Sequence, residues 1–445
     1  MLVAGCLIAA RRAGASSPPA TCEVSERMYA TAGGTIPEDC GRSEPRNGGA
    51  KPRAAGCEQW GGAMAERNWR NYLRRKTRNP QFLWQMVFAI LAAGIFGGMG
   101  AHFLRGAGGG ANMVLAPDEE DGAGGGEDAV EKLEALADEG SWREVWWALP
   151  AVAFQRMANP APLVLAAFAG ICWLIFCLQA AQVRAVRDAK LWLMLGGFAM
   201  GCLSIWPTHF FSMWLERRLG LAESAELVEG IRFFVLGVGL PEEGAKLLCF
   251  VPLIPLLLWV RGDLIAMLTA ASVGLGFAFI ENVTYFHGSS GLEAVGRYLT
   301  ANPFHMTLTG LAGLALYRAA RDPKGWGPQT LLVIGLMVAA HGLYDAAIVV
   351  PAFGEFSMVG MIAFALVVYQ FFRELRDLRP SSSEPVSLSA TFLAGTSMVT
   401  AATFAYVSWQ LGFQAACDAL AGQVLSMSLM AYLFLREMPE TMVTV

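Results

Sequence analysis

The amino-acid sequence predicts an all-α fold, a polytopic membrane helix bundle with about ten transmembrane helices. Hydrophobic residues make up 55% of its 445 residues and charged residues only 16%, where about 25% is usual in soluble proteins. The mean hydropathy is +0.43, and apolar runs long enough to cross a bilayer recur along the chain. A chain of this length cannot hide so many apolar side chains in soluble cores, so the surplus has to face lipid.

Charge and cysteine usage exclude several other classes of protein. The net charge of −4 is not the basic surplus that a nucleic-acid-binding protein normally carries, so no nucleic-acid partner is expected. Five of the nine cysteines lie in apolar segments, and the other four lack the spacing of a metal finger. We therefore expect neither a disulfide framework nor a structural zinc site.

The N-terminal stretch, residues 1–63, is rich in Ala, Gly, Pro, Ser and Arg and has no sustained hydrophobic periodicity. This composition predicts a disordered tail. An equally good interpretation is that synthesis starts at Met64 and that the preceding residues belong to a misassigned start.

Residues 64–159 are expected to anchor the chain in the membrane. A basic collar, Arg67 to Arg78, precedes a first membrane helix at Phe82–Phe103, which has the length of about 20 residues that a bilayer needs. An acidic, Gly-rich outer loop follows, and it ends in tryptophans that suit the membrane interface.

Nine further apolar segments complete the predicted set of membrane helices. They lie at residues 160–182, 191–214, 231–260, 264–286, 299–317, 329–351, 355–372, 387–411 and 415–435. We expect residues 160–375 to form the functional membrane core and residues 376–445 to add the last two helices.

Basic residues in alternate loops predict the orientation of these helices, because Lys and Arg collect on the cytoplasmic side of a membrane. With the basic collar inside, every second loop is basic, and the loops between them are acidic or nearly neutral apart from Arg217 and Arg218. The basic loops contain Arg184, Arg187, Lys190, Arg261, Arg318, Arg321, Lys324, Arg373, Arg376 and Arg379. Both termini are therefore expected in the cytoplasm.

Ionisable side chains lie deep in four consecutive predicted helices, where charge is costly and usually functional. These helices carry, in order, Glu242, Glu243 and Lys246; Glu281 and Asn282; His305; and His341 and Asp345. Spacings of four residues place several of them in pairs on one helix face. The rise of 1.5 Å per residue places all four sets at one level in the outer half of the membrane. We therefore expect one polar site formed by the four central helices.

Each pair alone has a structural interpretation, either as a self-neutralised ion pair or as a hydrogen-bonded contact between helices. The adjacent carboxylates of Glu242 and Glu243 weaken that interpretation, because two neighbouring carboxylates are not expected to pair with one lysine. The sequence also lacks the HExxH, GxSxG, GxGD and Walker A patterns. Site-2-type zinc proteases, rhomboid serine proteases, presenilin-like aspartyl proteases and ATP-driven pumps are therefore not indicated.

Taken in order, the four motifs resemble the PrsW family of intramembrane proteases, which is related to the type II CAAX prenyl proteases and the glutamate intramembrane proteases. The family pattern EExxK, FxxxEN, a histidine helix and HxxxD is matched by Glu242-Glu243-Gly-Ala-Lys246, Phe277-Ala-Phe-Ile-Glu281-Asn282, His305, and His341-Gly-Leu-Tyr-Asp345. The resemblance covers about residues 190–375. It implies an enzyme of the bacterial inner membrane that cuts membrane-anchored proteins, anti-sigma factors among them, on the outer side.

These residues suit amide hydrolysis, which needs an activated water, a group that stabilises the oxyanion and a proton donor. Removal from water favours the protonated form of a carboxylate, so a buried glutamate can act as a general base. We expect Glu242 or Glu243 to be that base and favour Glu243, because Lys246 follows Glu242 by one helical turn and keeps it charged. His341, held by Asp345, would assist proton transfer or bind the oxyanion.

The remaining site residues complete this hypothesis. Asn282 and His305 would donate hydrogen bonds to the substrate carbonyl, and Glu281 belongs to the same site. In a zinc version of the mechanism, His305, His341 and Glu243 would hold the metal and leave one position for water.

Two other functions stay open. A proton- or cation-coupled transporter also needs ionisable residues at depth, although the chain shows no internal repeat of the kind common in transporters. A membrane binding protein that has lost its activity is the other alternative, and the complete set of site residues weighs against it.

Overall fold

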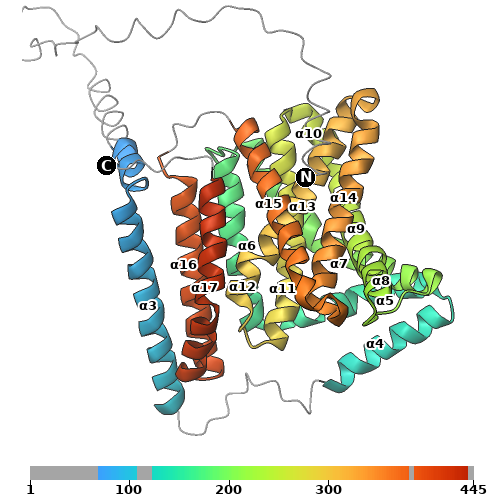
Figure 1. The fold of residues 1–445 in the computed structure, drawn as a ribbon, viewed down its shortest axis with the longest axis horizontal. Coiled ribbons are helices and arrows are strands. Elements are labelled where there is room, and N and C mark those ends of the chain that lie inside the picture. Colours follow the sequence, from blue (N-terminus) through green and yellow to red (C-terminus); the bar gives the residue numbers. More distant parts are fainter. Residues whose placement is uncertain (1–68, 108–122, 380–384, 439–445) are drawn as a thin grey trace, which may run out of the picture. The chain divides into compact units, whose positions relative to one another are not determined.

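The computed structural model describes residues 69–107, 123–379 and 385–438, and these residues are almost entirely helical and contain no strand (Figure 1). The predicted tail at residues 1–63 lies outside the described residues. The long helices are α3 (Pro80–Ala107), α6 (Pro160–Ala180), α7 (Ala189–Leu219), α11 (Asp263–Gly288), α13 (Ala301–Arg321), α14 (Pro323–Val349), α15 (Met358–Leu378), α16 (Leu388–Gln410) and α17 (Phe413–Glu437). The shorter helices are α4 (Ala123–Asp138), α5 (Trp142–Ala153), α8 (Leu227–Phe233), α9 (Leu240–Phe250), α10 (Ile254–Val260) and α12 (Ala294–Leu299).

The predicted all-α membrane bundle is confirmed. Within the described residues, eight helical segments are long and apolar enough to cross a membrane, and α17, which bends by 53°, would be a ninth. The tenth predicted segment, at residues 299–317, is helical as α13 but does not reach the same apolarity. The reason is that α13 carries polar side chains such as Asn302, His305 and Thr309, which are buried against other helices.

The segment predicted as one helix at residues 231–260 lies in one candidate membrane span, Leu227–Val260, which changes helix type along its length. It contains α8, a π-helical turn at Phe234–Gly239, α9, a 3₁₀ turn at Val251–Leu253 and α10. Three prolines, Pro241, Pro252 and Pro255, begin the pieces that follow the π-helical turn, because proline fits the first turn of a helix but not its interior. The π-helical turn directly precedes the helix that carries Glu242.

The described part of the predicted acidic outer loop is helical, and residues 108–122 of that loop lie outside the described residues. Residues 123–138 and 142–153 form α4 and α5, whose apolar side chains, among them Leu133 and Leu149, pack against Trp206 and Phe210 of α7. The indole rings of Trp146 and Trp206 lie 4.5 Å apart. This segment is therefore tied to α7 by aromatic packing.

Capping residues explain where several of the membrane helices begin. The side chains of Asn159, Asp188, Asp322 and Ser387 accept hydrogen bonds from backbone amides in the first turns of α6, α7, α14 and α16, which satisfies donors that a helix start leaves open. Helix α7 ends at Gly220, whose φ of 59° is the left-handed conformation that glycine adopts without strain.

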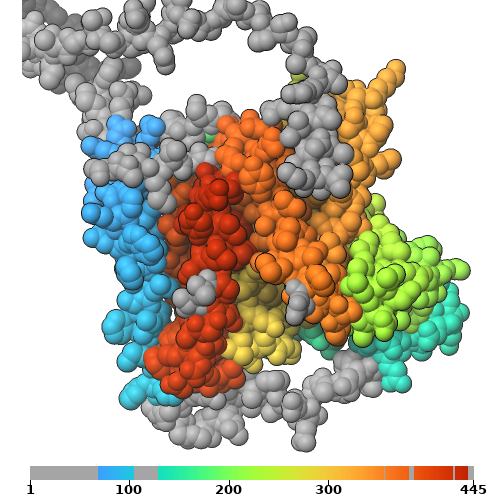
Figure 2. Space-filling model, viewed as in Figure 1, coloured from blue at the N-terminus to red at the C-terminus, as the bar shows by residue number. Residues whose placement is uncertain are grey.

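Helix α11 is the centre of the bundle and packs against α6, α7 and α13. Its contacts with α7 are close because glycines face each other: a Cβ atom at Gly201 or at Gly276 would overlap the backbone of the opposite helix. By contrast, α3 packs mainly against α16 through Gly94 and Gly98 and leaves most of its surface free. Figure 2 shows α3 in blue next to the red α16 and α17.

Contacts between helix ends gather the predicted basic loops at one end of the bundle. Arg318 and Arg321, at the end of α13, bind Asp263 at the start of α11 at 2.7 and 2.9 Å. Arg376 near the end of α15 binds Glu437 at the end of α17 at 2.8 Å. Helices α4, α5, α8 and α12 lie at the opposite end (Figure 1). This is the arrangement of helix ends that the predicted alternation requires.

Candidate active site

Helix α9 contributes three of the predicted site residues, and Lys246 joins the other two. Its ammonium nitrogen lies 2.8 Å from Glu243 and 3.1 Å from Glu242. The expectation that Lys246 would pair with Glu242 alone is wrong, as is the expectation that one lysine cannot pair with both carboxylates. Spacings of three and four residues lie on the same helix face, so both carboxylates reach one ammonium. The Glu243 side chain is 0% exposed, whereas that of Glu242 is 13% exposed.

Helix α11 contributes Glu281 and Asn282, and both bind Arg297 of α12. Arg297 donates a hydrogen bond of 2.6 Å to Glu281 and another to the amide oxygen of Asn282. The amide nitrogen of Asn282 in turn donates to Asn302. The amide of Asn282 is therefore engaged with protein groups, although we expected it to donate to a substrate carbonyl.

The two histidines face each other in the middle of the site, with ring centroids 5.2 Å apart. His305 is bound on both ring nitrogens: Nδ1 lies 2.9 Å from the Lys246 ammonium, and Nε2 lies 2.9 Å from Glu281. His341 places Nδ1 2.9 Å from Glu243, and its Nε2 lies 3.3 Å from Asp345. The structure thus brings all eight predicted site residues into one continuous polar cluster.

Two glycines allow the helices that carry the histidines to lie this close to their neighbours. A Cβ atom at Gly274 of α11 would overlap the carbonyl oxygen of His305. A Cβ atom at Gly342 would lie 2.5 Å from the Cα atom of Val235 in the π-helical turn. The close contact at each glycine fixes the backbone at or next to a site histidine.

The site contains a group that could hold a metal ion. One ligand atom from each of Glu242, His305 and His341 can be chosen so that all three lie within 4.8 Å of one another. The expected ligand Glu243 is not in this group, and Glu242 takes its place. Glu243 and Glu281 instead bind the far nitrogens of His341 and His305, which is the usual support for metal-binding histidines.

The charges of the site also suit a divalent cation. Four carboxylates, those of Glu242, Glu243, Glu281 and Asp345, lie with only two permanently cationic side chains, Lys246 and Arg297. The carboxylates therefore outnumber the permanent cations by two, and charge in a buried site is costly unless a proton or a bound cation balances it. Two nitrogen ligands and one carboxylate form a donor set typical of catalytic zinc.

Three groups outside the eight predicted site residues contact the cluster, and of these only Arg297 was not noted from the sequence. Arg297 lies on the short α12 between two predicted membrane helices, and its guanidinium stacks on the ring of Tyr285 at 3.6 Å. Thr309 donates a hydrogen bond of 3.2 Å to Glu243, and the ring of Phe277 lies 3.8 Å from the Lys246 ammonium. The sequence feature that could have indicated Arg297 is its position: it is a single arginine in an otherwise nearly uncharged outer segment, eight residues before His305.

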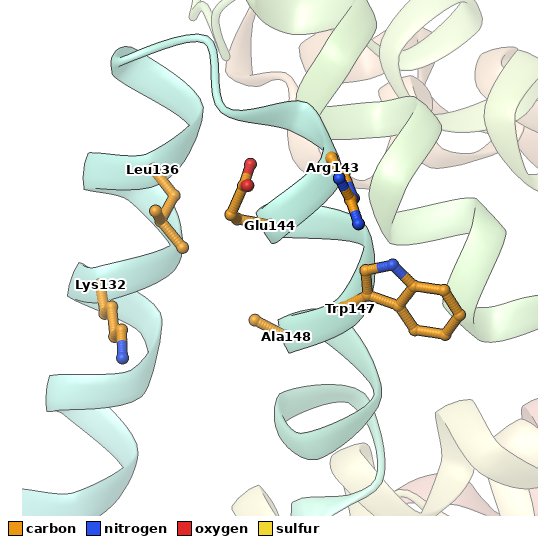
Figure 3. Close-up of a pocket in the computed structure, with 6 residues that line it drawn as sticks. All are labelled: Lys132, Leu136, Arg143, Glu144, Trp147 and Ala148. Atoms are coloured by element: carbon orange, nitrogen blue, oxygen red, sulfur yellow. The ribbon is translucent and has the colours of Figure 1, made fainter.

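An open groove of about 640 Å³ lies elsewhere, between α4 and α5 (Figure 3). Its lining consists of Lys132, Leu136, Arg143, Glu144, Trp147 and Ala148. None of the eight predicted site residues lines this groove, so it is separate from the polar cluster.

Comparison with known proteins agrees with the geometry of the cluster. Residues 189–371 match the model of a family described as PrsW family intramembrane metalloprotease. No curated protein and no solved structure matches the chain. The matched range runs from the start of α7 into α15 and includes all eight predicted site residues. Over residues 189–371, the chain is therefore similar to the PrsW family of intramembrane metalloproteases.

Proposed function

We propose that this protein is an intramembrane endopeptidase that hydrolyses peptide bonds of membrane-anchored protein substrates. The observation that carries the proposal is the convergence of four carboxylates and two histidines from α9, α11, α13 and α14 inside a bundle of apolar helices. Such a cluster can supply the base, the proton donor and the oxyanion-stabilising groups that amide hydrolysis needs.

Glu242 is the carboxylate best placed to act on a water molecule. Glu243 is fully buried and already binds Lys246, His341 and Thr309, so it has little room to bind water. Glu242 keeps partial exposure and lies 3.4 Å from Nε2 of His341. We therefore assign Glu242 as the general base, and Glu243, the base favoured by the sequence, as the residue that orients His341.

The other site residues support the reaction through His305 and His341. Asp345 and Glu243 bind the two ring nitrogens of His341, which suits this side chain to carry a proton to the leaving amine. Glu281, itself held by Arg297, orients His305 toward the same space. In a metal form of the mechanism, Glu242, His305 and His341 would instead hold a zinc ion, which would polarise the scissile carbonyl and lower the pKa of a water ligand. Glu242 and His341 would then act as ligands in place of their roles as base and proton carrier.

The proposed substrates are single-span membrane proteins such as anti-sigma factors, cut in the outer half of the membrane. We place the enzyme in a bacterial inner membrane, with both ends of the given sequence in the cytoplasm. The basic residues gathered at one end of the bundle support this orientation, and the site lies toward the other end, where α12 supplies Arg297.

A cleavage assay tests this proposal. The purified chain is reconstituted in vesicles with a panel of single-span membrane proteins, and Glu242→Gln is compared with Glu243→Gln. We expect Glu242→Gln to lower the cleavage rate by about 10³-fold, as is usual for the loss of a general base. Glu243→Gln keeps an oxygen acceptor for His341 and should lower the rate by only about tenfold.

The matched control is Glu223→Gln, at an exposed glutamate of the loop after α7, which should cleave at the wild-type rate. A larger loss in Glu243→Gln than in Glu242→Gln would return the base to Glu243. Failure of the wild-type chain to cleave any member of the panel would overturn the protease proposal and favour a binding protein.

A further inference from the structure

We infer that Lys246 competes with the metal ion for the active site, because its ammonium contacts two of the three groups that would hold the ion. The inference deepens the proposed function and depends on the same site. A divalent cation and the Lys246 ammonium cannot both contact Glu242 and His305. Metal binding therefore requires the ammonium to move away from these two side chains.

The hydrogen bonds of the two histidines show which ring nitrogens remain for a metal. Nε2 of His305 binds Glu281, so a metal would take Nδ1. Nδ1 of His341 binds Glu243 at 2.9 Å, and Nε2 has a longer contact of 3.3 Å with Asp345, which a metal ion would replace. Nε2 of His341 lies 3.4 Å from the Glu242 carboxylate. The metal-binding atoms are therefore Nδ1 of His305, Nε2 of His341 and an oxygen of Glu242.

The Lys246 ammonium lies at two of these three atoms. Its nitrogen is 2.9 Å from Nδ1 of His305 and 3.1 Å from the Glu242 oxygen. Both distances are those of hydrogen bonds, so the lone pairs that would bind a metal are already used. Two cations so close together would also repel each other strongly in a buried site.

Lys246 has partners that it can keep when it leaves these atoms. Glu243 is not one of the three metal-binding residues, and it lies 2.8 Å from the ammonium. The aromatic ring of Phe277 lies 3.8 Å from the same nitrogen, within the range of a cation–π contact. The lysine side chain is unbranched and has four methylene groups, so it can shift its ammonium while Glu243 still neutralises it.

The movement of the Lys246 ammonium between these positions explains how the four carboxylates of the site can stay close together when no metal ion is bound. The ammonium neutralises part of the charge of Glu242 and Glu243 and saturates one nitrogen of His305. Because the ammonium competes for these groups, the site binds the ion more weakly than the same two histidines and glutamate would without Lys246. Lys246 therefore sets the concentration of metal at which the site becomes loaded.

The experiment measures the affinity of the detergent-purified chain for Zn²⁺ by competition with a fluorescent chelator. The test variant is the double substitution Glu243→Gln with Lys246→Met, which removes one negative and one positive charge and so leaves the net charge of the site unchanged. The amide introduced by Glu243→Gln would still offer an oxygen to His341. We expect the Kd for Zn²⁺ to fall about tenfold or more, since the competing ammonium is gone.

Two variants control for other causes. Glu243→Gln alone retains Lys246 and should bind Zn²⁺ no more tightly than the wild-type chain. Lys246→Arg retains the charge on a longer side chain that cannot leave the site as easily, and it should raise the Kd about tenfold. Size-exclusion profiles and Tm values establish that each variant is folded, and Lys246→Arg carries the test if the double variant is not.

The outcomes separate this inference from the proposed function. A double variant that binds Zn²⁺ no better than the wild-type chain, or a wild-type chain and variants that bind none, overturns the role of Lys246 even if the wild-type chain cleaves substrates. Tighter binding by the double variant supports that role even if no substrate is cleaved, an outcome that would count against the protease alone.

Discussion

Arg297 shows how much a single side chain can contribute to this site. It binds Glu281, donates to the amide oxygen of Asn282 and stacks on Tyr285. Glu281 in turn binds His305. The guanidinium therefore neutralises the mostly buried carboxylate of Glu281. Its planar shape lets it bind several groups at once, which a lysine ammonium does not do in the same way.

We predict that Arg297→Gln destabilises the protein by about 2 kcal/mol, because Glu281 is left without its cation in a mostly buried position. Thermal denaturation in detergent measures the effect. The added substitution Glu281→Gln should recover part of the loss, since it removes the unpaired charge. Arg232→Gln is the control: Arg232 and Glu229 form an exposed ion pair on α8, and such pairs contribute little. Equal Tm values for Arg297→Gln and the control would contradict the prediction.

Residue identities in the site were predictable, but their pairing was not. Charged and polar residues are rare at membrane depth, so the eight site residues could be identified from hydropathy alone. The pairing depends on rotamers and on helix rotation, so spacing could not show that Lys246 reaches Glu243 as well as Glu242. Arg297 was not predicted as a site residue because it belongs to a short helix at the end of the bundle, where an arginine is not unusual.

Helix α14 depends on a close contact at one of its glycines. Gly342 lies against the π-helical turn at Phe234–Gly239, and it directly follows His341. The turn and α9 are continuous, so this contact also positions the helix that carries Glu242. π-Helical turns of this kind are often found next to functional sites.

We predict that Gly342→Ala lowers the cleavage rate and destabilises the protein by about 2 kcal/mol, because overpacking forces α14 away from the π-helical turn. Gly335→Ala on the same helix is the control, since a Cβ atom there meets no atom within 4 Å. That substitution should be neutral or slightly stabilising, as alanine is favoured over glycine in helices. Comparable losses in the two variants would show that helix propensity, and not the close contact, is responsible.

At the level of elements, hydropathy identified where helices lie but not where the helix type changes within a span. All ten predicted segments are helical, because a backbone in lipid must satisfy its own hydrogen bonds. The changes of helix type in residues 231–260 depend on local packing around prolines and glycines, which a hydropathy window averages out. The α4–α5 pair was predicted as a loop because its glycines and acidic residues concealed the apolar side chains that pack against α7.

For the molecule as a whole, the arrangement of charge predicts one orientation. We expect a cysteine placed at Glu134 on α4 to react with a membrane-impermeant maleimide added to intact cells, in a chain whose native cysteines are replaced by serine. A cysteine at Lys324, at the start of α14, should react only after the membrane is opened. Both positions are exposed. The reverse pattern of labelling would overturn the orientation and the proposed side of cleavage.

The parts of the chain that surround the matched range were predictable in outline only. Hydropathy located α3, α16 and α17, but their packing depends on small residues such as Gly94 and Gly98, which let α3 approach α16 closely. In addition, α6 lies outside the matched range 189–371 and still packs against α11. Its Trp173 also donates a hydrogen bond to the backbone oxygen of Tyr298 on α12. The packed helical core therefore extends beyond the matched range.

The modest apolarity of α13 has a consequence for how the protein is made. Helix α13 has Asn302, His305 and two threonines near its start. Such polar groups make it unfavourable for this helix to move from the translocon into lipid by itself. It becomes favourable once α11 and α14 are there to surround it. The nascent chain therefore has to extend past α14 before His305 can contact His341, so the polar cluster forms only after the four helices that carry it have been made.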